Sequence, residues 1–290
     1  MEASANSHHK TASPGPASGW MDASVPTPAQ LKTRLWSTMR RVDSGRPRIL
    51  GFYGHHERQV NGCFSNFAAT TFSFELPAGL LPPGSDATKF PSKVTVEFSE
   101  KAIMLCKAAA MGDSASYHQI ARAGSPDIAK RLGRKVVPFD DARWQMLVCH
   151  VAREVVYQKF SKLPPLREHL LATGSQILAE ATRNDRIWGI GLNTNEDISV
   201  PARWRGTNVL GWALMQTRER LRAESVATSA SAATAASGTA LKKLGKKLAE
   251  IQRLKAQQAD GKPLMRNQLD KVAKEAELRK LLREEKAKQV

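Results

Sequence analysis

The apolar residues that follow Phe98 recur every three to four positions, and this helical period constrains the fold more than any other feature of the chain. Predicted helices begin where Ser, Asp or Thr can cap the first turn and where Pro can occupy its first position. These helices span 99–111, start at Ser125 with Pro126, run from Asp140 or Asp141 past Phe160, span 166–171, and run from Thr207 to about Leu221. Most of the chain between 99 and 221 is therefore predicted to be helical.

The residues before Phe98 have the pattern of short strands. Strands are predicted at 49–53, 67–75 and 93–98, with a Pro- and Gly-rich loop at 77–92. The chain has no βαβ alternation, no G-x-G-x-x-G and no G-x-x-x-x-G-K-[ST], so neither a dinucleotide-binding sheet nor a P-loop is predicted. The predicted fold class is mainly α with a small β-sheet, in an α+β body.

Two changes of composition divide the chain. Residues 225–240 have no charge, no large apolar residue and no periodicity, which predicts a flexible linker. Residues 1–44 are rich in Ser, Ala, Pro, Thr and Gly, which predicts a mostly disordered leader with a short periodic patch at 29–39. The body therefore spans 45–224, and a tail spans 241–290.

The sequence of the tail predicts a basic helical hairpin. Two amphipathic helices, at 241–258 and 265–288, are joined by a turn at 260–263. The chain has a net charge of +17, and its last fifty residues contain 15 Lys and Arg against 7 Asp and Glu. A basic tail on a nearly balanced body predicts a polyanionic partner for the tail, and we expect contact with RNA or the ribosome through 241–290. A charged, solvated coiled coil is the alternative.

Several classes of protein are excluded by what the sequence lacks. No run of about 18 apolar residues predicts a membrane span, and the start has no secretory signal pattern. The three cysteines lie far apart, so neither a disulfide framework nor a C-x-x-C metal site is predicted, and a reducing compartment is indicated. Arginines near the end of the leader suggest a transit peptide, whereas its acidic residues and prolines argue against one. We expect a cytoplasmic or nuclear protein without membrane contact.

Glu100 and Lys107 stand on the stripe of the 99–111 helix that should face the core. A carboxylate that is partly removed from water has a raised pKa, which suits proton transfer or the stabilisation of a cation. The alternative is structural, because a Glu in the first turn answers the helix dipole and a Lys can extend its amine to water.

A second candidate site is the segment from Asn184 to Gly191, in which Asp185 precedes Trp188 and Gly189. A carboxylate, an aromatic plate and glycines that allow close backbone approach suit a flat, polar ligand. A turn with a core Trp is the alternative. Three further residues are ambiguous: Trp144 is core or pocket wall, Arg134 binds phosphate or answers a helix dipole, and Asn66 makes a turn or contacts a ligand.

The order of these pieces resembles the NADAR (YbiA-like) domain family, over about 160 residues. The resemblance rests on Phe64-Ser65-Asn66-Phe67, Ser99-Glu100, Lys107-Ala108, Gly112-Asp113, Ser125-Pro126, Ala129-Lys130, Leu132-Gly133-Arg134, Trp144, Lys159-Phe160, Leu170-Leu171-Ala172-Thr173-Gly174, Glu180-Ala181, Asp185, Trp188-Gly189-Ile190-Gly191, Trp204, Gly206, Asn208, Leu210-Gly211 and Leu214-Met215. The tail weakly resembles the C-terminal helical hairpin of some translation initiation factors and ribosome-associated proteins.

The resemblance implies a mainly α fold and hydrolysis of an N-glycosidic bond to ribose, in a riboflavin-pathway intermediate or in ADP-ribosylated guanine. It implies that Glu100 is the catalytic carboxylate and that Asp185, Trp188 and Gly189 belong to the active-site loop. It also implies that Lys107, Arg134, Trp144 and Asn66 shape the pocket or hold phosphate. Lys101 and Ala102 depart from the family, which often has Gln or His and then an aromatic residue there.

The chemistry fits these residue types, because an oxocarbenium-like transition state needs a carboxylate and the departing base needs an acid or hydrogen-bond donor. The donor is Asp185 or Lys107, and no metal or cofactor is expected. Two other functions stay open: a module that binds an ADP-ribose-like nucleotide without turnover, and an RNA- or ribosome-associated protein that acts through its tail.

Overall fold

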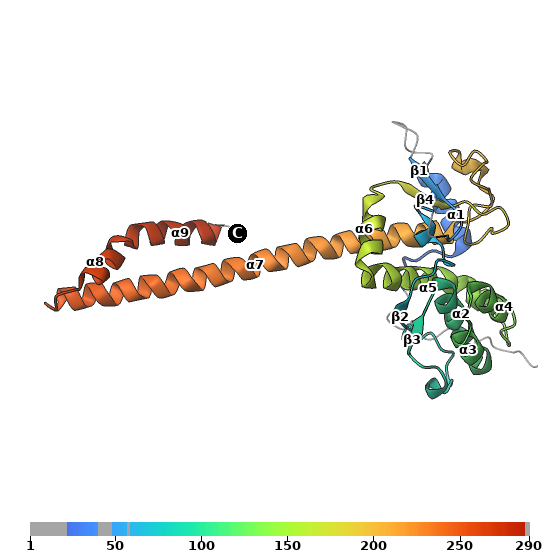
Figure 1. Ribbon diagram of the computed structural model, residues 1–290, viewed down its shortest axis with the longest axis horizontal. Helices are drawn as coiled ribbons and strands as arrows, with labels where there is room; N and C mark the ends of the chain where they lie inside the picture. The colour runs from blue at the N-terminus through green and yellow to red at the C-terminus, as the bar shows by residue number, and fades with distance from the viewer. Residues whose placement is uncertain (1–21, 40–47, 57–58, 288–290) are drawn as a thin grey trace, which may run out of the picture. The chain divides into compact units, whose positions relative to one another are not determined.

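The computed structural model describes residues 22–39, 48–56 and 59–287 (Figure 1). It forms two compact units, Met1–Leu221 and Arg222–Val290. The first unit contains the helices α1 (Pro28–Met39), α2 (Ser99–Ala110), α3 (Ser114–Ala121), α4 (Pro126–Gly133), α5 (Asp141–Lys162) and α6 (Pro164–Ala172), with the start of α7 (Val209–Ala259). The predicted mainly α class is confirmed.

Local capping explains where the helices begin. The Ser125 side chain accepts from Ile128 N at 3.3 Å with Pro126 in the first helical turn, and Asp140 accepts from Arg143 N at 3.0 Å, as the sequence predicts. Helix α3, which the sequence did not predict, is capped by Asp113 through Ser116 N at 2.9 Å.

Two predicted caps are wrong. Phe98 occupies the cap position of α2, and Ser99 is the first residue of the helix. The Thr207 hydroxyl donates to Ile187 O at 2.7 Å, so it ties the start of α7 to the 185–189 loop rather than capping the helix.

Within the described residues, four short strands make two two-stranded sheets. Strands β2 (Phe72–Glu75) and β3 (Lys93–Val96) pair antiparallel, within the segments predicted as strands. Strand β1 (Ile49–Phe52) pairs in parallel with β4 (Ile177–Glu180). Strand β4 was not predicted from the sequence. The register of this pair places Glu180 opposite Phe52, at the carboxyl end of β4.

Helix α2 lies at the centre of the body, where it packs against α3, α4 and α5 (Figure 1). Its side chains are buried almost all round, and Ile103 and Leu105 are fully enclosed. Each such aliphatic side chain contributes roughly 1.5–3 kcal/mol by leaving water. The helix that carries Glu100 is therefore held rigidly by its neighbours.

The structure differs from the predicted disordered leader at residues 22–39. Helix α1 begins with a reciprocal cap in which Gln30 N donates to Thr27 Oγ1 at 3.3 Å and Thr27 N donates to Gln30 Oε1 at 3.0 Å. Leu31 joins the core at 2% exposure, and Arg153 of α5 binds Asp22 at 3.2 Å. The remainder of the predicted leader, residues 1–21 and 40–44, lies outside the described residues.

The second unit is a helical hairpin made by the end of α7 with α8 (Arg266–Ala273) and α9 (Glu275–Ala287). Lys255 binds Glu275 at 2.9 Å and Lys271 binds Glu250 at 2.6 Å across the hairpin. The second predicted helix of the tail is thus two helices that meet at Lys274.

The predicted flexible linker at 225–240 is helical, because α7 continues through it. Seven of these sixteen residues are Ala, the residue with the highest intrinsic helix propensity, and this preference outweighs the lack of an amphipathic pattern.

Candidate active site

Glu100 lies in the first turn of α2, where its backbone N–H donates to Asn66 O at 2.9 Å and joins the helix to the loop before β2. Its side chain is only 6% exposed. Burial raises the pKa of Glu100 from 4.5 to about 7, against the opposing charge of Lys130 and with added repulsion from Asp185. The raised pKa expected from the sequence is thus present, and its main cause is desolvation.

Asp185 organises the loop that follows β4. Its Oδ1 accepts from Trp188 N at 2.8 Å and from Ile187 N at 3.1 Å. Its other oxygen, Oδ2, lies 4.0 Å from Nζ of Lys130 on α4. The carboxylate therefore shapes the loop with one oxygen and faces a cation with the other.

Two glycines let this loop close against β4 and the start of α7. A Cβ at Gly189 would lie 2.9 Å from Glu180 O and 3.1 Å from Asp185 O, and a Cβ at Gly206 would overlap Gly189 O. Trp188 is partly buried and packs on the main core, while its backbone O accepts from Leu210 N at 3.1 Å. The structure thus shows Trp188 as a core contact, and its role as an aromatic plate for a ligand stays a prediction.

Two residues of the site were not among the sequence-predicted candidates. Lys130, on α4, lies near Asp185 and 5.4 Å from the centre of the Phe67 ring. Glu180, at the end of β4, has an enclosed oxygen, Oε2, without a hydrogen-bond partner among the described residues. Burial, with repulsion from Asp185 and Glu100, raises the pKa of Glu180 to about 8 against the opposing charge of Lys130.

Asn208 fixes the backbone at Glu180. Its side-chain oxygen accepts from Glu180 N at 3.1 Å, and its side-chain nitrogen donates to Leu178 O at 2.8 Å. Asn208 has φ of 54°, a conformation that Asn tolerates better than most residues. Glu180 is consequently held both by β1 and by the start of α7.

A second group contains Lys107, which follows Glu100 by two helical turns on α2, and Trp144 of α5. The Lys107 amine lies 4.3 Å from the centre of the Phe139 ring and 5.9 Å from that of Trp144. Burial first, and then the charge of Arg134, lower the pKa of Lys107, while Glu100 opposes this change. Trp144 is 8% exposed, so it belongs to the core and forms a wall beside Lys107.

Arg134 follows α4 as its C-cap residue and is exposed, which fits both a phosphate contact and a response to the helix dipole. The charges of Arg134 and Asp185 act on Glu100, and those of Arg134 and Glu100 act on Lys107, so these four residues lie in one region.

A buried lysine binds the backbone of the residues just before Asn66. Lys159, 1% exposed, donates to Cys63 O at 2.6 Å and to Ser65 O at 3.2 Å, and burial lowers its pKa to about 8. Asn66 is 6% exposed, and its side chain makes no hydrogen bond with another described residue. Its amide therefore keeps donors and an acceptor for a ligand.

Lys101 and Ala102, which differ from the residues that the family often has at these positions, both have a structural role. Lys101 is 3% exposed, its amine pairs with Glu97 and lies 5.3 Å from the centre of the Phe98 ring, and Ala102 is fully buried. These two positions contribute an ion pair and core packing.

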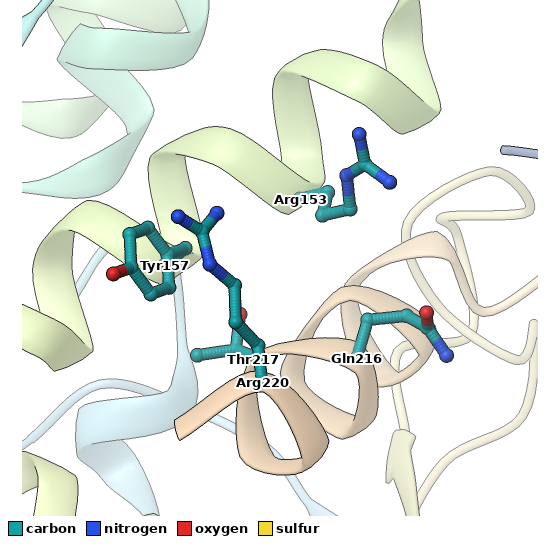
Figure 2. Close-up of a pocket in the computed structure, with 5 residues that line it drawn as sticks. All are labelled: Arg153, Tyr157, Gln216, Thr217 and Arg220. Atoms are coloured by element: carbon teal, nitrogen blue, oxygen red, sulfur yellow. The ribbon is translucent and has the colours of Figure 1, made fainter. Parts of the chain in front are cut away.

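A separate cavity of about 240 Å³ lies between α5 and α7. Figure 2 shows Arg153 and Tyr157 on one side and Gln216, Thr217 and Arg220 on the other, with the Arg220 guanidinium 3.3 Å from the centre of the Tyr157 ring. None of the sequence-predicted site residues lines it. Among the described residues, no cluster of three metal-ligating side chains is present and no helix can span a membrane.

Comparisons show which known proteins this chain is similar to. The NADAR domain model matches residues 51–222. N-glycosidase R617 of Acanthamoeba polyphaga mimivirus is 35% identical over 122 residues, which cover 42% of this chain and 72% of that protein. N-glycosidase YbiA of Shigella flexneri is 30% identical over 176 residues, which cover 61% of this chain and 90% of YbiA. The NMR structure of the E. coli protein YbiA is 28% identical, with a TM-score of 0.46 and coverage of 65% of this chain and 93% of YbiA.

Proposed function

Because the chain belongs to the NADAR domain family and is a hydrolase acting on N-glycosyl compounds, we propose that its body cleaves the bond between a ribosyl carbon and a base nitrogen. The family model spans more than half of the chain. The N-glycosidases R617 and YbiA each align with this chain over most of their own length.

The enclosed carboxylate of Glu100 is the observation that carries this proposal. Cleavage of a ribosyl C–N bond passes through an oxocarbenium-like transition state, which requires a nearby anion and an oriented water. Glu100 is almost fully buried, and it interacts electrostatically with Lys130 of α4 and with Asp185 of the loop after β4. In such a site a carboxylate stabilises a developing cation more strongly than it does in water.

We further propose a phosphate-bearing substrate, either an early riboflavin-pathway intermediate or ADP-ribosylated guanine. Lys107 and Arg134 are cations that interact with Glu100, and positive charge there suits a phosphate or pyrophosphate. Trp188 offers a partly exposed aromatic side chain, and the Asn66 amide offers hydrogen bonds that can select a base or a ribose hydroxyl.

The test compares the parent with Glu100→Gln on both substrate classes, with mass spectrometry of released ribose phosphate or ADP-ribose. Loss of the charge at nearly constant shape should lower turnover by ~10³-fold or more. Glu168→Gln removes an exposed carboxylate of α6 and should leave turnover unchanged. Turnover of Glu100→Gln within a few-fold of the parent would refute the role of Glu100.

A module that binds nucleotide without turnover is the alternative for the body, and Lys101 and Ala102 favour it because the family's aromatic position is absent. The same assay separates the two functions. Binding of ADP-ribose by the parent, without release of product from either substrate class, would identify the binding module.

We propose in addition that the hairpin binds a polyanion such as RNA. Lys242, Lys243, Lys246 and Lys247 are all exposed on α7, and the acidic residue nearest to them along the helix, Glu250, is paired with Lys271. Exposed lysines on one helix can displace counterions from nucleic acid, so binding should weaken steeply with salt.

Deletion of 241–290 tests this second proposal. It should leave turnover of a small substrate unchanged and reduce co-sedimentation with ribosomes at low salt. A protein with these four lysines changed to Glu keeps the hairpin length and serves as the matched comparison. Equal co-sedimentation of all three proteins would show that the hairpin is not an anchor.

A further inference from the structure

We propose that Glu180 is the general acid of the reaction, and that its carboxyl donates a proton to the departing base. This inference rests on the proposed N-glycosidase function. It replaces the two donors that the sequence suggests, Asp185 and Lys107.

The position of Glu180 is fixed on three sides. Glu180 pairs with Phe52 across the parallel strands β4 and β1. Its backbone N–H donates to Asn208 Oδ1 at 3.1 Å, and its backbone O accepts from Ile190 N at 2.9 Å. The loop that begins at Asp185 packs directly against it, because Gly189 leaves no room for a side chain there. These contacts fix the backbone from which the Glu180 side chain projects.

The Glu180 carboxyl has unused hydrogen-bonding capacity. Its Oε2 is enclosed and has no partner among the described residues, although enclosed polar atoms are nearly always paired in proteins. A bound base that accepts a hydrogen bond would satisfy this group. An enclosed oxygen without a partner among the described residues is therefore what we expect of a carboxyl that donates to a substrate once the substrate is bound.

The charges around Glu180 favour its protonated form. Glu100 of α2 and Asp185 of the neighbouring loop repel a charge on Glu180, and Lys130 of α4 is the cation that opposes them. Burial is the largest cause of the raised pKa of Glu180, and the two carboxylates act in the same direction. A carboxyl that keeps its proton at neutral pH can act as an acid.

The two alternative donors are engaged elsewhere. Asp185 uses Oδ1 to hold two backbone N–H groups of its own loop. Lys107 lies two helical turns from Glu100, with its amine against the Phe139 and Trp144 rings.

The proton balance of the reaction closes with two carboxyl groups. As the C1′–N bond breaks, its electron pair goes to the base nitrogen, and the base takes the proton of Glu180. Water adds to C1′ and gives a proton to the Glu100 carboxylate. The products are the free base and the sugar with a new hydroxyl, and exchange of one proton with solvent or between the two groups restores the starting state.

An activated leaving group tests this role. Each protein is assayed on a ribosyl nucleotide that releases a base and on p-nitrophenyl ribofuranoside 5-phosphate, whose leaving group departs without a proton. Glu180→Gln should lower base release by ~10²- to 10⁴-fold and p-nitrophenol release by less than ~10-fold. Glu100→Gln should lower both rates, because its charge acts on the sugar.

A similar loss on both substrates in Glu180→Gln would overturn the proposal, since it would make Glu180 a structural or cation-stabilising group. If Glu180→Gln does not fold, the pH profile of the parent decides. Base release should decline above the pKa of Glu180 while p-nitrophenol release does not, and parallel declines would overturn the proposal. A parent that hydrolyses neither substrate would overturn the N-glycosidase function itself.

Discussion

Replacement of Glu100 by Gln should stabilise the body at neutral and basic pH while it abolishes turnover. Burial raises the pKa of Glu100 from 4.5 to about 7, so the folded chain holds a proton that the unfolded chain releases. Below pH 4.5 the carboxyl is protonated in both the folded and the unfolded chain, so it imposes no electrostatic cost on folding. As the pH rises from 4.5 to 7, the unfolded chain releases the proton and the free energy of unfolding falls. At pH 7.5 the ionised carboxylate costs about 3 kcal/mol, at roughly 1.4 kcal/mol for each unit of pKa difference.

The assay is thermal unfolding of the parent and Glu100→Gln at pH 4.5 and at pH 7.5. Gln carries no titrating charge, so the pH-dependent part of the cost disappears while the cost of burying a polar side chain remains at both pH values. For a domain of this size 1 kcal/mol corresponds to roughly 2–4 °C in Tm. The advantage of the variant should therefore be about 6–12 °C greater at pH 7.5 than at pH 4.5.

Glu168→Gln is the control, because the carboxylate of Glu168 is exposed on α6 and stays hydrated in the folded chain. Its Tm relative to the parent should change little between the two pH values. A Glu100→Gln variant with the same Tm difference at both pH values would refute the reasoning, because it would show that the charge of Glu100 is not desolvated.

Two further substitutions separate residues of the site from residues that support it. Asp185→Asn should lower turnover, because it removes a negative charge that helps Glu180 to keep its proton; Tm should change little because the amide oxygen can still accept from Ile187 N and Trp188 N, and a large fall in Tm would make Asp185 structural. Lys159→Met leaves the Cys63 and Ser65 carbonyls without their donor and should lower the free energy of unfolding in urea titration, by less at pH 7 than at pH 9, because at pH 7 it also removes a charge that burial disfavours; an unchanged midpoint at pH 9 would contradict these hydrogen bonds.

The parts of the fold that the sequence predicts correctly are those with local signals. Helices α4 and α5 begin at Ser125 and Asp140, whose side chains cap their own first turns. The stripe that includes Glu100 identifies a carboxylate on a buried face, and α2 is indeed enclosed. In each case a few neighbouring residues contain the whole signal.

The parts that the sequence did not predict depend on contacts between distant segments. Strand β4 has four residues without polar alternation, and it is a strand because β1 lies beside it, more than a hundred positions earlier. Because no strand was predicted there, the position of Glu180 could not be inferred from the sequence. Lys130 stands in the last turn of α4, where a basic residue is expected to answer the helix dipole, and its position near Asp185 emerges only when the loop after β4 folds back.

The errors in the leader and the linker have a common cause. Thr27 and Gln30 form a reciprocal cap with Pro28 between them, a local helix signal within a segment whose composition suggests disorder. Residues 225–240 lack a hydrophobic stripe, yet their alanines favour helix without any packing. In both segments average composition concealed an intrinsic helix preference.

The elements that carry Glu100 and Glu180 bear on the opposite roles that we propose for their carboxyl groups. Glu100 lies in the first turn of α2, where unpaired N–H groups and the helix dipole favour a negative charge. Glu180 lies at the carboxyl end of a strand, which offers no comparable field, and its Oε2 has no donor among the described residues. Lys130 opposes the charges of both groups, so the difference between their elements is what favours the proton on Glu180, in agreement with the roles proposed for Glu100 as the anion and Glu180 as the acid.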